Sequence, residues 1–63
     1  MGKTLREQAA FILDATLEAE VRKYGTFTDS ARNTLAFWLD GGRVRTAYVR
    51  KLIGYLRMIA RSA

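Results

Sequence analysis

The apolar pattern near the C-terminal end is the feature that most constrains how this chain can fold. From Val44 to Arg61 the apolar side chains recur every three or four residues, so at about 100° per residue they fall in one half-turn of a helix. They are Val44, Tyr48, Val49, Leu52, Ile53, Tyr55, Leu56, Ile59 and Ala60. A helix with so wide an apolar face must pack against other elements to be stable in water. The pattern predicts an amphipathic helix over residues 44–61.

The opposite side of this helix carries a row of arginines. Arg50 and Arg57 are seven residues apart, Arg61 follows four later, and Arg43 extends their line from just ahead of the helix. Gly54 falls within the row. No acidic residue interrupts it, although protein surfaces usually mix charges of both signs. The row favours a polyanionic ligand, and the alternative interpretation is the ordinary solvated face of a surface helix.

Two shorter helices are predicted ahead of it. Thr4 and Glu7 have the spacing of a capping box, and the apolar residues that follow predict a first helix over residues 4–24, which Gly25 would end. The cluster of N-cap residues at positions 28–30 predicts a second helix over residues 28–40, with Trp38 as its core anchor. We therefore expect an all-α fold of three helices.

Composition limits both the fold and the chemistry. The 63 residues form a single helical domain over residues 1–63, near the lower size limit for independent folding, and they contain neither Cys nor His. Disulfides, thiol nucleophiles, Cys/His zinc sites and imidazole catalysis are therefore excluded. Self-association remains as a source of stability, and the apolar face of residues 44–61 is wider than two modest helices would cover. We expect a homodimer with no cofactor and no metal.

Three aromatic residues are candidates for a dimer or partner contact. Phe11 lies among the acids Glu7, Asp14 and Glu18, and Phe37 lies opposite the apolar side of its helix; Tyr48 is the third candidate. Single exposed aromatics are also ordinary on protein surfaces. The three acids repeat the seven-then-four spacing of the arginines, which permits pairing between two chains but not within one.

The segment of residues 35–42 leading into Arg43 resembles the helix-turn-helix of DNA-binding proteins. It joins two predicted helices, the second of them basic, through a turn that contains glycine. The pair Gly41 and Gly42 makes this turn longer than in that motif, and Thr46 stands where an apolar residue is expected. The resemblance implies DNA binding through the basic helix.

The formal net charge of +5 favours an anionic partner. We expect a nucleic-acid-binding regulator that contacts mainly the phosphate backbone, because the basic helix lacks the amides that usually read bases. The expected contact residues are Arg43, Arg50, Arg57 and Arg61 on phosphates, Gly54 for close approach, and Arg45, Lys51 and Arg32 around them.

Other functions are weighed against this one. The main alternative is an interaction module or inhibitor that docks on an acidic surface of a larger protein through the exposed aromatics and arginines. Binding to an anionic membrane is a weaker alternative, because the first two helices can cover the apolar face. No base, activated nucleophile or metal cluster is recognisable, so we expect no enzyme. No apolar run could span a bilayer or act as a signal peptide, and we expect a cytoplasmic protein.

Overall fold

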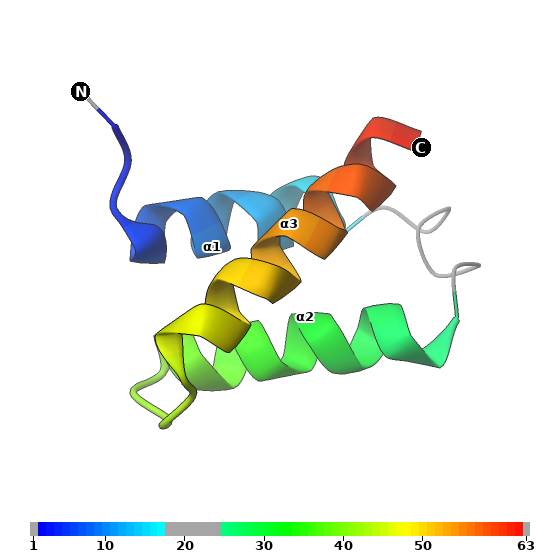
Figure 1. Ribbon diagram of the computed structural model, residues 1–63. Helices are drawn as coiled ribbons and strands as arrows, with labels where there is room; N and C mark the ends of the chain where they lie inside the picture. Colours follow the sequence, from blue (N-terminus) through cyan, green and yellow to red (C-terminus); the bar gives the residue numbers. More distant parts are fainter. Residues whose placement is uncertain (1, 18–24, 63) are drawn as a thin grey trace.

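Three α-helices account for the regular structure of the part of the chain that the computed structural model describes, residues 2–17 and 25–62. They are α1 (Leu5–Ala15), α2 (Thr26–Leu39) and α3 (Thr46–Ser62). The first two run in opposite directions, and α3 lies diagonally across both of them (Figure 1). The predicted all-α fold of three helices is confirmed, but apart from the start of α1 the helix boundaries differ from the predicted ones.

The predicted start of α1 is confirmed and its predicted end is wrong. Thr4 Oγ1 accepts a hydrogen bond from the Glu7 backbone N–H at 3.1 Å, and the Thr4 N–H donates to Glu7 Oε1 at 2.8 Å, which completes the capping box. The helix ends at Ala15 rather than at residue 24, because the Thr16 hydroxyl donates to the Ile12 carbonyl at 2.7 Å. Such local side-chain bonds compete with helix continuation. The remainder of that prediction, residues 18–24, lies outside the described residues.

The second helix begins two residues earlier than predicted. Gly25, which was expected to end the first helix, instead precedes α2 with a φ of 98°, a conformation that glycine adopts without a steric cost. Thr28, a predicted N-cap, is buried inside the first turn, and its hydroxyl lies 3.0 Å from the hydroxyl of Tyr55. This bond joins α2 to α3 and could not be inferred from local capping patterns.

Two glycines end α2 in a Schellman motif. The Gly41 N–H donates to the Trp38 carbonyl at 3.0 Å and the Gly42 N–H donates to the Phe37 carbonyl at 2.9 Å, while Gly41 has a φ of 102°. The ring of Phe37 packs directly on Gly42, where an added Cβ would overlap the ring carbons. This contact stands in for the apolar contact that usually accompanies the motif.

The third helix begins at Thr46, two residues later than predicted. Its first hydrogen bond runs from the Val49 N–H to the Arg45 carbonyl at 2.9 Å. Val44 packs against the core from the connection between the helices instead of from a helical turn. Arg43 therefore lies within the connecting segment, three residues ahead of α3.

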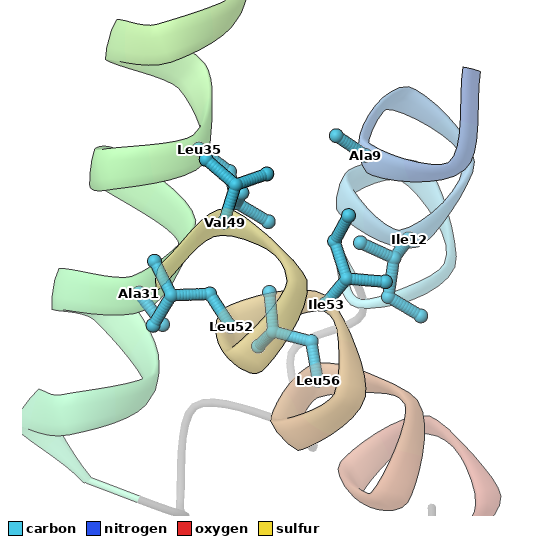
Figure 2. Packing of buried hydrophobic residues seen from close by; sticks show 8 residues of the cluster. All are labelled: Ala9, Ile12, Ala31, Leu35, Val49, Leu52, Ile53 and Leu56. Carbon is cyan, nitrogen blue, oxygen red and sulfur yellow. The ribbon is translucent and has the colours of Figure 1, made fainter. Parts of the chain in front are cut away.

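The apolar face of α3 forms the centre of the core, as predicted. Val49 and Leu52 point toward α2, and Ile53 points toward α1 (Figure 2). The buried apolar residues are Ala9, Ile12, Ala31, Leu35, Val49, Leu52, Ile53, Leu56 and Ile59, five of which belong to α3. Trp38, the predicted anchor, packs at the margin of this cluster and is only partly buried. None of the helices in the described residues is long and apolar enough to cross a membrane.

The capping box of α1 should make the stability of the protein depend on acid pH. Hydrogen bonds from Thr4, first from its backbone and then from its side chain, lower the pKa of Glu7 below its usual value of 4.5. As pH falls, the unfolded chain then takes up the proton first. The stability that these hydrogen bonds contribute is therefore fully present above the unfolded-state pKa and is lost as pH falls through the folded-state pKa. We expect the Tm of the wild type to fall more steeply than that of Glu7→Gln between neutral pH and about pH 3, by circular dichroism. Parallel curves for the two proteins would contradict this role of Glu7.

Candidate nucleic-acid interface

Charge is unevenly distributed along the chain. Residues 41–63 contain six basic and no acidic side chains, whereas residues 1–40 contain five basic and six acidic ones. The excess of positive charge is therefore confined to α3 and the connection that leads into it. On α3, the side chains of Arg50, Lys51, Arg57 and Arg61 are all exposed.

The arginine row keeps its predicted helical spacing in α3. Arg50, Arg57 and Arg61 fall within about 40° of one another around the helix axis and extend over about 16 Å along it. Gly54 is exposed beside them, with no atom within 4 Å of the position that a Cβ would take. The structure thus brings three of the four predicted row residues onto one helix face, and Arg43 lies apart from them in the connection.

One arginine of the row, Arg57, contacts α1. Arg57 Nη2 donates to Gln8 Oε1 of α1 at 3.0 Å, and Gln8 Nε2 donates to the Lys3 carbonyl at 3.1 Å. Gln8 is neutral, so this bond orients the guanidinium of Arg57 without cancelling its charge. Among residues 2–17 and 25–62, the side chains of Arg50 and Arg61 have no hydrogen-bonding or ionic partner.

Sequence reasoning missed Lys3 and Gln8 as neighbours of this surface. The Lys3 amine lies 4.1 Å from the centroid of the Phe11 ring, a cation–π contact, and the Lys3 backbone is bonded to Gln8. Gln8 lies at the edge of the apolar stripe of α1, a position that usually flanks a neighbouring helix. The position of Gln8 beside the apolar stripe is the sequence feature that could have indicated this contact.

The three predicted contact aromatics are all exposed, to 60% for Phe11, 57% for Phe37 and 44% for Tyr48. The first two also have contacts inside the chain, Phe11 with Lys3 and Phe37 with Gly42. Their positions off the apolar stripes therefore have a partial explanation within one subunit. Phe27 of α2 is a fourth exposed aromatic, with its ring centroid 4.8 Å from that of Tyr55 in an edge-to-face arrangement.

Arg32 lies away from the row and connects α2 to the end of α1. Its Nη2 donates to the Leu13 carbonyl at 2.9 Å and its Nε donates to Thr16 Oγ1 at 3.1 Å. In the opposite direction, Arg6 of α1 donates to the Leu39 carbonyl at the end of α2. Each of the two helices therefore receives a guanidinium from the other at its C-terminal end, where positive charge is favourable. The described contacts give Arg32 a structural role.

Arg43 and Arg45 lie beside a shallow hollow at the connection between α2 and α3. The hollow has a volume of about 370 Å³ and is lined by Trp38, Gly42, Arg43, Val44 and Arg45. The guanidinium of Arg6 lies 5.4 Å from the centroid of the Trp38 ring.

The connection between α2 and α3 comprises the six residues 40–45. It is longer than the turn of three or four residues in a helix-turn-helix, so the resemblance to that motif gives no support for a DNA-binding function.

Arginine is the chemically important group in this surface. Its planar guanidinium donates paired hydrogen bonds to phosphate or carboxylate oxygens and remains charged at any physiological pH. Within the described part of the chain, no three His, Cys, Asp or Glu side chains group together as metal ligands would.

Comparison with known proteins gives no further guide to the function. No family model, curated protein or solved structure matches this chain.

The structural role of Arg32 predicts a stability effect that the row arginines should not show. Arg32→Ala removes both bonds to the end of α1, and because hydrogen bonds from charged donors contribute about 1.5–3 kcal/mol, we expect a loss of at least 1 kcal/mol in the free energy of unfolding. The matched control Arg50→Ala removes an exposed guanidinium without a described partner, and it should change the free energy of unfolding by no more than about 0.5 kcal/mol. Urea denaturation measures both. Equal stabilities of the two variants would show that the Arg32 bonds contribute nothing.

Proposed function

We propose that this chain is a small, non-enzymatic nucleic-acid-binding protein that contacts the phosphate backbone through the exposed face of α3. The observation that carries the proposal is the arginine row of α3, which is exposed and bonded to no carboxylate in the described residues. A cationic surface of this kind releases counterions from a polyanion, and that release provides most of the affinity of backbone binding.

The side chains available on α3 favour backbone contacts over base readout. The exposed face contains no Asn or Gln, which are the usual readers of adenine. Arginine can read guanine, but evenly spaced arginines along one helix match a series of phosphates better than a mixed base sequence. We therefore expect weak sequence preference and a strong dependence on salt.

The salt dependence of binding tests the proposal. We expect the logarithm of the affinity for a labelled DNA duplex to fall linearly with the logarithm of salt concentration, with a slope near −3 or steeper, since each phosphate contact contributes about −0.9. Arg50→Gln combined with Arg57→Gln should make the slope shallower by about 1.8, because two contacts are removed. Fluorescence anisotropy measures these affinities. Affinity that hardly changes with salt would overturn the proposal.

Two controls separate the arginine row from net charge. Arg50→Lys preserves the charge at that position and should leave the slope unchanged. Arg57→Gln combined with Asp29→Asn preserves the net charge of +5, because it removes one acidic group from the first turn of α2. If that double variant binds as tightly as the wild type, overall charge and not the row accounts for the affinity.

The presence of glycine at position 54 supports the proposal that a ligand binds this face of α3. Glycine within an exposed helix destabilises it by about 0.5–1 kcal/mol relative to alanine, and no atom of the described fold would touch a Cβ at this position. The fold therefore gives no reason for glycine here. Close approach of a phosphate backbone to α3, between Arg50 and Arg57, would give one.

Gly54→Ala should therefore separate stability from binding. We expect the free energy of unfolding to rise by about 0.5–1 kcal/mol, because helix propensity improves, and the affinity for the duplex to fall, because the methyl group holds the backbone away. Thermal denaturation and anisotropy give the two values. A variant that is both more stable and equally tight in binding would show that Gly54 has no part in the contact.

A protein–protein interaction module, or a homodimer, remains the second candidate. It is supported by the large apolar side chains that the fold leaves exposed, among them Phe11, Phe27 and Phe37. The salt titration distinguishes the two functions, since docking through aromatic anchors would leave nucleic-acid affinity low and nearly independent of the arginine row.

A further inference from the structure

The hollow between α2 and α3 combines an aromatic ring with two arginines outside the α3 row. Trp38 contributes its indole, and Arg43 and Arg45 flank Val44 in the connecting segment. Its volume is about 370 Å³, and it is shallow and open to solvent, so a group bound there would be covered on one side only. The hollow could accept a group of about the size of one nucleobase with its sugar and phosphate.

The charges beside this hollow favour an anion. The side chains of Arg43 and Arg45 have no hydrogen-bonding or ionic partner within residues 2–17 and 25–62, and the first turn of α3 contains no acidic residue. Asp40 is the only acidic residue in the connection, and no ion pair joins it to either arginine among the described residues. The arginines are therefore free to bind an external phosphate.

The position of the Trp38 ring is fixed from the side of α1. The guanidinium of Arg6 lies over the ring, with its Cζ 5.4 Å from the ring centroid, and also donates to the Leu39 carbonyl, while the ring packs against the margin of the core. A ring held in this way loses little conformational freedom when a flat group stacks on it. Stacking of bases on such aromatic side chains is a main source of affinity for single-stranded nucleic acids.

We propose that this hollow binds one unpaired nucleotide of a single-stranded nucleic acid, with its base against Trp38 and its phosphate between Arg43 and Arg45. This inference rests on the proposed function and specifies its ligand further, since a base within a duplex is not available to stack. The arginine row of α3 then follows the adjoining backbone, and the hollow selects strands with an accessible base.

Trp38 is the only tryptophan in the chain, so its fluorescence reports directly on this site. We expect an unlabelled thymidine strand of about ten nucleotides, within the usual site size for such proteins, to quench the emission of the wild type. An abasic strand of the same length and a DNA duplex should bind, as shown by anisotropy with labelled copies, without comparable quenching. The thymidine strand should also bind about five-fold or more tightly than the abasic strand, because stacking adds to the backbone contacts.

Two double variants assign the effect to the hollow without altering the core. Arg43→Gln with Arg45→Gln should reduce the quenching at saturation, because the nucleotide is no longer held against the ring. Arg50→Gln with Arg57→Gln should weaken binding and leave the quenching at saturation unchanged, because the hollow is intact. Both pairs remove two positive charges, so they are matched in net charge.

The outcomes separate this inference from the proposed function. Salt-dependent binding of the thymidine strand without any change in Trp38 emission would contradict the proposed nucleotide site in the hollow, but not the proposed binding surface on α3. Equal quenching by the thymidine and abasic strands would also overturn it, because no base would then be involved. Absence of binding to all three nucleic acids would overturn both proposals.

Discussion

The exchange of arginines between α1 and α2 is the interaction on which the rest of the structure depends. Neither helix has a basic residue in its own last turn, and each receives a guanidinium from the other, Arg32 for the end of α1 and Arg6 for the end of α2. Both bonds satisfy carbonyl groups that a helix end leaves without partners, and both place positive charge at the negative end of the helix dipole. Because they act at opposite ends of an antiparallel pair, they set its length and alignment. A chain of 63 residues has little apolar area with which to do this.

The pair formed by α1 and α2 determines which side of α3 stays available. The apolar side of α3 is used in contacts with both helices (Figures 1 and 2). The arginines on its other side remain on the surface. The bond from Arg57 to Gln8 then orients one guanidinium along the seam between α3 and α1. The same architecture brings the start of α1, the end of α2 and the start of α3 to one end of the molecule, where Arg6, Trp38 and Arg43 lie near one another. A stable core and a cationic surface thus arise from one helix arrangement.

The sequence predicted the features that depend on periodicity and local chemistry. The buried face of α3, the arginine spacing on its other face and the capping box at Thr4 were all recognisable, since each involves residues a few positions apart. The helix boundaries other than the start of α1 were predicted less well, and some of the bonds at the helix ends join distant residues. Arg32 donates to the end of α1, and Thr28 in the first turn of α2 is bonded to Tyr55. Arg32 was expected to widen the contact surface because of its charge, which does not distinguish a guanidinium that caps another helix from an exposed one.

The confinement of the excess positive charge to residues 41–63 has a consequence before any contact is made. Since the described acidic side chains belong to α1, α2 and the start of the connection, the molecule has a permanent electric dipole directed toward α3. In the field of a polyanion such a dipole experiences a torque, which turns α3 toward the ligand while the two are still separated by a few Debye lengths or less. More of the diffusional encounters then begin in a productive orientation, and this advantage disappears as added salt shortens the range of the field.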